Sequence, residues 1–309
     1  MKQVLAVGVL SVFGFLPWAA TPEFTEWSPA VNLGPGVNTT FVDSCVSISK
    51  NGLSLIFSSN RQSPGTMNRD LYVSKRAAKQ LPWGTPAPLT SLNTSDWESC
   101  PALSLDEYDL YFTSDRPGGC GATDIWVSHR RYRGDDFGWE PPRNLGCDYD
   151  GYVNSHRDDL MPAFFEDDEG RVLMYFSSDR PTSHSVDIYQ SVMRGDGSFG
   201  PATPVVELNT YDYDASAIVR RDGLEIIFGS TRPGGSGVKY STDFWTATRT
   251  STSEPWSTPV FVPSLGSPAW MGGRIALSFD GRELYFASSR RGGIGRTDLW
   301  VATRERTER

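Results

Sequence analysis

Five copies of one short motif constrain the fold of this 309-residue chain more than any other feature. The last copy, residues 278–304, reads SFDGRELYFASSRRGGIGRTDLWVATR and alternates apolar with polar residues between glycine-containing turns. Alternation with aromatic and β-branched residues predicts strands. The arginines that mark the copies lie 55, 64, 52 and 58 residues apart: Arg61, Arg116, Arg180, Arg232 and Arg290. This period indicates an array of units that bury their apolar faces against one another.

Each unit also contains a strand that begins with an aromatic residue and a short strand of small residues. The expected number of strands per unit is therefore four. Four antiparallel strands in each of five units predict an all-β fold, a single five-bladed β-propeller. The aromatic-led segment comes first in the chain, and the last unit ends after its third strand at Arg304. We therefore expect Trp27 to Leu33 to join the last blade and close the ring, which removes a free sheet edge.

The first 20 residues differ from the rest of the chain. Lys2 precedes an apolar run from Val4 to Trp18, and Ala19-Ala20 follows. This pattern predicts a signal peptide over residues 1–20 and assigns residues 21–309 to the propeller. We therefore expect a periplasmic or secreted monomer whose mature chain does not insert into a membrane. The net charge of −8 argues against nucleic acid as a partner.

Export makes disulfides possible, and the chain has four cysteines, Cys45, Cys100, Cys120 and Cys147. Four cysteines allow three pairings, and free buried thiols are a further alternative. Equivalent positions in neighbouring repeats favour a Cys45–Cys100 bond. Two loops expected on the same face of the propeller favour Cys120–Cys147. No Cys-x-x-Cys spacing occurs and the chain has three histidines, so a zinc site is not expected.

The best-preserved copy, residues 278–300, follows the pattern Ser-x-Asp-Gly-x-x-Leu-Tyr-Phe-x-Ser-x-Arg-x-Gly-Gly-x-Gly-x-x-Asp-Leu-Trp. This pattern resembles the TolB-type, WD-like propeller repeat of exported bacterial proteins. The resemblance covers nearly all of the mature chain and implies the propeller fold. It implies little about activity, because such blades occur in binding proteins, scaffolds and accessory domains of enzymes.

The repeated arginines and aspartates are interpreted as structural. Arg61 and Asp70 flank one loop, and each of the other copies has a corresponding pair. An ion pair between the two side chains would fix that loop through charge-assisted hydrogen bonds. The Gly-Gly-x-Gly segments are read as turns, because no helix follows them and a phosphate-binding loop would need one.

A ring of carboxylates is expected where the innermost strands begin. Aligning the copies on their Ser-x-Asp-Gly turns places four acids at one equivalent position and Gly272 at the fifth: Asp43, Glu98, Asp159 and Asp214. Asp96, Asp158 and Asp212 stand nearby, and the same loops contain the aromatic residues Trp97, Tyr213 and Trp270. The alternative is that each carboxylate caps backbone amides of its own loop.

Two functions are compatible with this ring. The first is an exported binding or scaffold module that takes a protein, peptide or glycan on its loop face and acidic channel mouth, through the four ring acids with Trp97, Tyr213 and Trp270. The alternative is a glycoside hydrolase or polysaccharide lyase in which Asp43, Glu98, Asp159 and Asp214 supply acid and base. The absence of recognisable hydrolase motifs favours the non-catalytic interpretation.

No cofactor or structural metal is expected, and calcium is kept as an alternative. Besides the ring, the insertion Gly146 to Asp158 contains Asp148, Asp150 and Asn154, whose oxygens are of the type calcium prefers. Their spacing is not that of an EF-hand, and an ordinary acidic loop explains them equally well.

Overall fold

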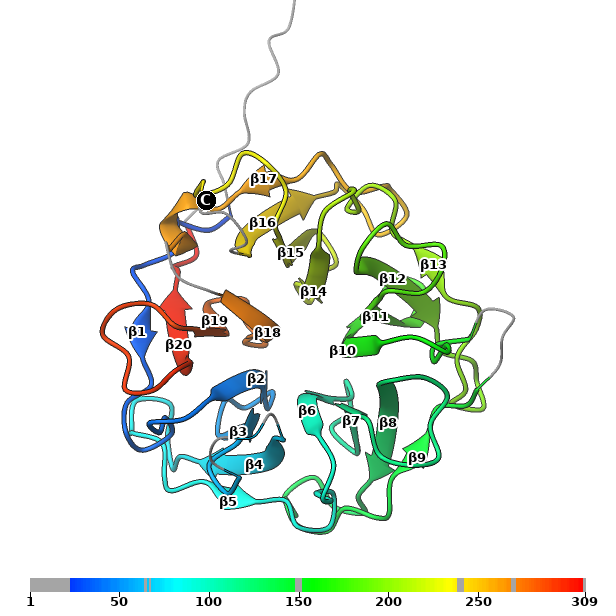
Figure 1. Cartoon of the computed structure of the whole chain (residues 1–309). Coiled ribbons are helices and arrows are strands. Elements are labelled where there is room, and N and C mark those ends of the chain that lie inside the picture. Colours follow the sequence, from blue (N-terminus) through cyan, green and yellow to red (C-terminus); the bar gives the residue numbers. More distant parts are fainter. Residues whose placement is uncertain are drawn as a thin grey trace, which may run out of the picture.

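The chain folds into five four-stranded antiparallel sheets arranged around a common axis, with the innermost strand of each sheet nearest to it (Figure 1). We call the region along this axis the channel. The structure is a computed structural model that describes residues 23–63, 66, 68–147, 152–237, 242–267 and 271–307. The predicted signal peptide therefore lies outside the described residues. The five-bladed β-propeller predicted from the repeats is confirmed.

The strands of blades 1 to 3 are, from the channel outward, β2(Asp43–Ile48), β3(Ser54–Ser59), β4(Asp70–Lys75) and β5(Ala87–Pro88); β6(Glu98–Leu103), β7(Asp109–Ser114), β8(Asp124–His129) and β9(Arg143–Asn144); β10(Asp159–Glu166), β11(Val172–Ser178), β12(Asp187–Val192) and β13(Thr203–Pro204). Blade 4 comprises β14(Asp214–Val219), β15(Glu225–Ser230), β16(Asp243–Thr248) and β17(Val260–Phe261), and is followed by the short 3-10 helix η1(Pro263–Leu265). Blade 5 comprises β18(Met271–Leu277), β19(Glu283–Ser288), β20(Asp298–Thr303) and β1(Val31–Asn32).

The hydrophobic core lies between neighbouring blades. One cluster joins Val46 and Phe57 of blade 1 to Tyr285 and Leu299 of blade 5, and equivalent clusters fill the other gaps. The second strands are buried on both faces, so the centre of each is a run of three or four apolar residues and not the predicted alternation. Each blade therefore depends on two neighbours for burial of its apolar surface, as the repeat predicts.

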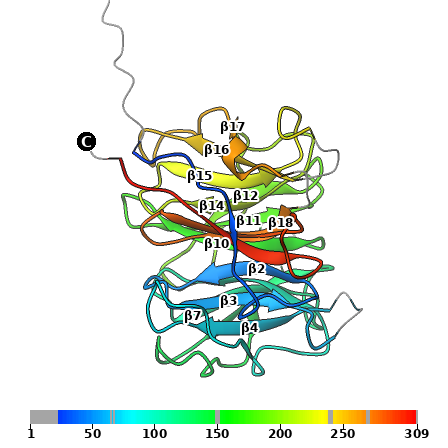
Figure 2. The same ribbon diagram turned by 90° about the vertical axis from the view of Figure 1, so that its left-hand side faces the viewer.

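The first strand closes the ring as predicted. β1 pairs with β20, with Val31 opposite Val301 and Asn32 opposite Trp300. The blue β1 and the red β20 lie together on the side of the molecule that faces the viewer in Figure 2. Arg304, next to β20, stacks on the Trp27 ring at 4.3 Å. The ring is thus held by strand pairing, by stacking and by burial of Trp27.

A bulge interrupts each innermost strand, and the bulged residues fill the channel. The backbone has positive φ at Cys45, Cys100, Met161 and Ser216. These side chains meet in pairs across neighbouring strands: Cys45 and Cys100 form a disulfide, and the Ser216 hydroxyl lies 2.9 Å from the Met161 sulfur. The predicted Cys45–Cys100 bond is confirmed.

Strand β18 departs from this pattern and contributes Arg274 to the channel. Its register shifts between Gly272 and Ala276, over a longer interval than the shift between Ser44 and Val46 in β2. The Arg274 guanidinium donates to the carbonyl oxygens of Pro162 in β10 at 2.5 Å and Val46 in β2 at 2.6 Å. The Arg274 backbone N–H also donates to the Cys45 sulfur at 3.1 Å, so Arg274 lies directly beside the disulfide.

Candidate functional site

The channel has two mouths, which we name by strand direction. The entrance face is where each innermost strand begins, and the exit face is where it ends. The four predicted ring acids, Asp43, Glu98, Asp159 and Asp214, are the first residues of β2, β6, β10 and β14. Each lies opposite a serine of the neighbouring strand, so the ring is a consequence of strand register at the entrance face.

All four ring carboxylates are completely buried and bonded within the fold. Each forms an ion pair with the repeat arginine of its own blade, at 2.7 Å for Arg61–Asp43, 2.9 Å for Arg116–Glu98, 2.8 Å for Arg180–Asp159 and 2.6 Å for Arg232–Asp214. Each also accepts a backbone N–H from its own loop, at residues 39, 94, 155 and 210. None of the four is exposed to a ligand in this arrangement, which is that of the architectural alternative.

The pKa is raised at two of the ring acids. Burial raises the pKa of Glu98, and hydrogen bonds from Thr94 and the Arg116 charge oppose that increase. Burial likewise raises the pKa of Asp159, which Arg180 opposes. Desolvation thus disfavours the ionised form at these two positions, and the arginine partners offset it only in part.

The predicted pairing of Arg61 with Asp70, and of its counterparts, is wrong. The arginine reaches the ring acid of its own blade instead. Three of the repeat aspartates accept backbone amides of the glycine-rich loops: Asp124 from Cys120 and Gly121, Asp243 from Ser236, and Asp298 from Ile294 and Gly295. The two charged residues of the repeat therefore stabilise different features of each blade.

The residue predicted at the ring position of blade 5 is also wrong. Counting from the Ser-x-Asp-Gly turn predicts Gly272 as the fifth member of the ring. The strand register instead places Met271 opposite Ser288, where the acids of the other blades lie opposite their serines. The difference arises because the bulge in β18 contains one more residue. Trp270, predicted beside the gap, lies outside the described residues.

A second set of carboxylates at the entrance face is accessible to solvent. Asp115 and Asp179 follow the ends of β7 and β11, and Asp158 immediately precedes β10. All three are partly or largely exposed. The carboxylate of Asp115 accepts the Trp97 amide at 2.7 Å, and that of Asp179 accepts the Asp158 amide at 2.9 Å. We call Asp115, Asp158 and Asp179 the mouth carboxylates.

Two aromatic residues predicted for the site lie at the entrance face, and one of them, Trp97, adjoins Asp115. Trp97 is partly exposed in blade 2 and stacks with the Arg69 guanidinium at 5.9 Å. Tyr213 is partly exposed in blade 4, and burial of its hydroxyl raises its pKa to about 12. Arg69 also lines a cavity of about 270 Å³ between blades 1 and 5, together with Asn60 and Arg296.

The candidates predicted from the sequence include Trp97 and Tyr213, with Asp158 nearby, but not Asp115, Asp179 or Arg69, which lie at the same face. A usable signal exists, because the residue before each repeat arginine varies while its neighbours recur: Asn60, Asp115, Asp179, Thr231 and Ser289. In four blades a side-chain oxygen at this position accepts the backbone N–H of the residue before the ring acid, and in blades 2 and 3 that oxygen belongs to a carboxylate.

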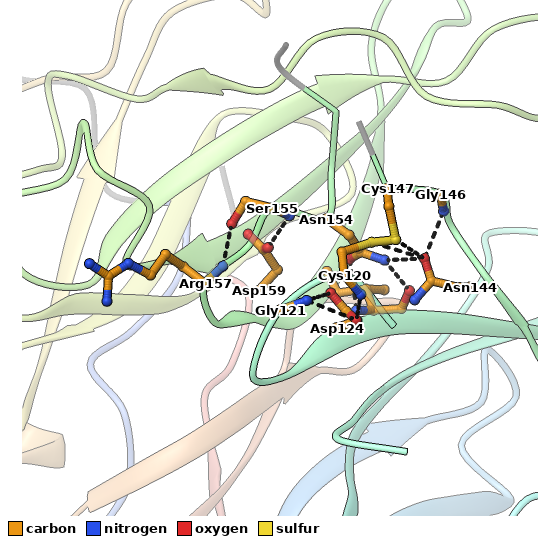
Figure 3. The surroundings of a disulfide bond; sticks show 11 residues. Cys120, Gly121, Asp124, Asn144, Gly146, Cys147, Asn154, Ser155, Arg157 and Asp159 are labelled. Carbon is orange, nitrogen blue, oxygen red and sulfur yellow. Dashed lines mark hydrogen bonds between the residues drawn. A yellow bond between two sulfur atoms is a disulfide. The ribbon is translucent and has the colours of Figure 1, made fainter. Parts of the chain in front are cut away.

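A disulfide joins two loops of the entrance face, as predicted. Cys120 follows β7 and Cys147 follows β9, with their Cα atoms 5.1 Å apart (Figure 3). The neighbouring Gly121 lies so close to the next blade that a Cβ there would collide with the Arg157 carbonyl oxygen. The bond therefore fixes a loop that already packs tightly against blade 3.

We expect the Cys120→Ser/Cys147→Ser double variant to lose about 3 kcal/mol of unfolding free energy, because the cross-link restricts the unfolded chain. Chemical denaturation of the double variant beside wild type measures the loss. Ala122→Ser, exposed in the same loop, is the matched control and should unfold like wild type. Peptide mapping under non-reducing conditions that recovers both thiols free would contradict the assignment.

Among the described residues, no group of three or more acidic, histidine or cysteine side chains is arranged to hold a metal ion. Asp148 and Asp150 of the predicted alternative calcium loop lie outside the described residues, and calcium there stays untested. No helix within the described ranges has the length and apolarity needed to cross a bilayer.

No protein-family profile and no curated protein sequence matches the chain. Solved structures share its fold over almost its whole length. An α-L-arabinofuranosidase from Podospora anserina, solved with cellotriose, aligns with a TM-score of 0.58 at 13% identity, covering 92% of this chain and 98% of the other. An endo-arabinase from Bacteroides thetaiotaomicron aligns with a TM-score of 0.57 at 16% identity, covering 92% and 99%. A putative TolB from Agrobacterium tumefaciens aligns with a TM-score of 0.47 at 13% identity, covering 88% and 92%.

These comparisons correct the predicted function. The similar structures are mainly family 62 and family 43 glycoside hydrolases and not binding or scaffold modules. The prediction of a binding or scaffold module is therefore wrong, and the alternative of a carbohydrate-active enzyme is the better supported one. At these identities the alignments show the five-bladed fold, and the activity of this chain is a proposal.

Proposed function

We propose that this protein is a glycoside hydrolase whose active site is the entrance mouth of the channel. The observation that carries the proposal is the combination, at one mouth, of solvent-accessible carboxylates with a partly exposed tryptophan. Hydrolysis of a glycosidic bond requires two carboxyl groups, and aromatic rings provide stacking surfaces for sugar rings. The similar propellers solved with cellotriose and with xylotriose support a glycan as the substrate class.

The mouth carboxylates are the proposed acid and base, in place of the buried ring. One carboxyl group protonates the leaving oxygen as the bond from the anomeric carbon breaks. A second removes a proton from the attacking water or attacks the carbon itself. Asp158 and Asp179 lie in one blade and Asp115 in the next, so these groups approach a bound sugar from different blades. The ring beneath them is assigned to holding the loops that present these groups.

The cellular location is part of the proposal. Two disulfides are typical of proteins that fold in an oxidising compartment. Together with the apolar N-terminal segment, they support an exported enzyme, periplasmic or secreted. That the enzyme acts as a monomer stays a prediction. The TolB-type repeat describes the blades of this enzyme and does not specify its reaction.

The proposal predicts which substitutions stop turnover. Asp115→Asn, Asp158→Asn and Asp179→Asn preserve side-chain shape but remove the titrating group. We expect at least one of them to reduce the rate by about 10²-fold or more, because general acid–base catalysis contributes that much. Oligosaccharide release from arabinan and xylan, followed chromatographically, is the measurement.

Asp196→Asn is the matched control for this series. Asp196 is an exposed aspartate in the loop between β12 and β13, on the exit face, and its substitution should leave turnover unchanged. Wild-type rates in all three mouth variants would contradict the assigned carboxylates. A wild-type chain that cleaves none of the glycans would contradict the enzyme class.

A further inference from the structure

The exit mouth of the channel is a funnel that the proposed reaction does not use. Its inner part has a volume of about 110 Å³ and its outer part about 350 Å³. Both parts share apolar walls formed by Phe164, Ile218 and Leu277, and both include Phe279. Concave, largely apolar sites of a few hundred cubic ångströms are typical of small-molecule binding.

A buried positive charge forms the floor of this funnel. Arg274 is 5% exposed and lines the inner part. Its Nε and Nη1 donate to the carbonyl oxygens of Pro162 and Val46, whereas its Nη2 donates to none of the residues that the structure describes. No carboxylate within the described ranges forms an ion pair with it, and burial lowers its pKa to about 9. A buried cation without a counter-ion is costly, so an anion at this position would be stabilising.

Two more cations stand at the rim of the funnel, held by one aromatic ring. The Arg221 guanidinium lies 4.0 Å from the centroid of the Phe279 ring, and the Lys50 ammonium lies 5.2 Å from it. Neither forms an ion pair with a carboxylate in the described part of the chain. Phe279 thus keeps two like charges close together at the opening.

The two acidic groups that line the funnel form no ion pair with these cations in the described part of the chain. Glu107 accepts the backbone N–H of Lys50 at 2.6 Å, which orients its carboxylate toward the main chain of the turn. Glu166 lines the outer part but is exposed to solvent, where screening is strong. Three cations that form no ion pair within the described ranges therefore line one cavity, in a protein whose net charge is −8.

We propose that the exit funnel binds a small organic anion, a carboxylate attached to an apolar body. The carboxylate accepts a hydrogen bond from Arg274 Nη2 at the floor, and the apolar body packs against Phe164, Ile218 and Leu277. Lys50 and Arg221 attract the anion to the opening and close over its outer end. This site lies on the face opposite the proposed active site, so it is a second and independent binding function.

Calorimetric titration of the full chain with benzoate tests the proposal, with acetate and sulfate as comparison anions. We expect benzoate to bind at least about 10-fold more tightly than acetate, because its ring removes apolar surface from water. Sulfate, which lacks an apolar body, should bind more weakly than benzoate. Equal affinity for the three anions, or no binding of benzoate, would overturn the proposal.

Substitutions locate the binding. Arg274→Met should weaken benzoate at least about 10-fold, because it removes the charged donor to the carboxylate. Arg291→Met removes the same charge from an exposed position on the entrance face and should leave the affinity unchanged. Equal weakening in both variants would show a general charge effect and would refute the site.

A second variant keeps the test decisive if Arg274→Met does not fold. Lys50→Met/Arg221→Met changes two exposed side chains at the rim and should fold normally. We expect it to weaken benzoate about 10-fold by removing two attractive charges from the opening. Unchanged affinity in this variant would count against the proposal, whatever the result at Arg274.

Discussion

Deletion of residues 26–34 is expected to cause the largest loss of stability of any change considered for this chain. The deletion removes β1, which exposes the hydrogen-bonding edge of β20, and it removes Trp27 from beneath Arg304. Loss of a buried tryptophan alone typically costs about 3–5 kcal/mol. An open edge strand also promotes association between molecules. Denaturant melts and sedimentation should therefore show a destabilised and aggregating protein.

Val31→Thr is the matched control for the deletion. Val31 belongs to β1 but is 63% exposed, so its substitution retains the pairing and should leave stability nearly unchanged. A deletion variant that melts like wild type and remains monomeric would contradict closure by β1.

The second large effect is expected at the buried ring. Asp214→Ala leaves Arg232 without its ion-pair partner at 2.6 Å, in a position with no access to solvent for the carboxylate. Removal of one partner from a buried ion pair typically costs about 3–5 kcal/mol. We expect similar losses for the corresponding variants at Asp43, Glu98 and Asp159, measured by chemical denaturation.

Two further variants separate a structural role from a catalytic one. The double variant Asp214→Ala/Arg232→Met removes both charges and should recover part of the lost stability, because no unpaired charge remains. Asp196→Asn, exposed on the exit face, should have no effect. Unchanged stability at two or more ring positions would mean that the ring is not part of the architecture.

The fold could be predicted from the sequence because its information is repeated five times. Strand number, blade order and closure all follow from the spacing of Arg61 and its counterparts and from the position of Trp27. The disulfides could be predicted for the same reason, since the repeat places Cys45 and Cys100 at equivalent positions.

The errors arose where spatial and sequence neighbours differ. Arg61 is nearer in sequence to Asp70, yet it pairs with Asp43, 18 residues away, because antiparallel register brings the ends of β2 and β3 together. The alignment of turns does not reveal the longer bulge in β18. It therefore predicts Gly272 at the ring position that Met271 occupies. Arg274 was missed because a residue inside a bulge belongs to no repeated position.

The bulges provide equivalent positions on different strands, and different side chains occupy these positions. Cys45, Cys100, Met161 and Ser216 share one backbone conformation on four different strands, yet they form a covalent bond in one case and a thioether–hydroxyl contact in the other. Their side chains occupy the channel, while the cores of the blades are built from other residues. The contents of the channel can therefore be exchanged, by mutation or by design, without rebuilding the blades that surround it.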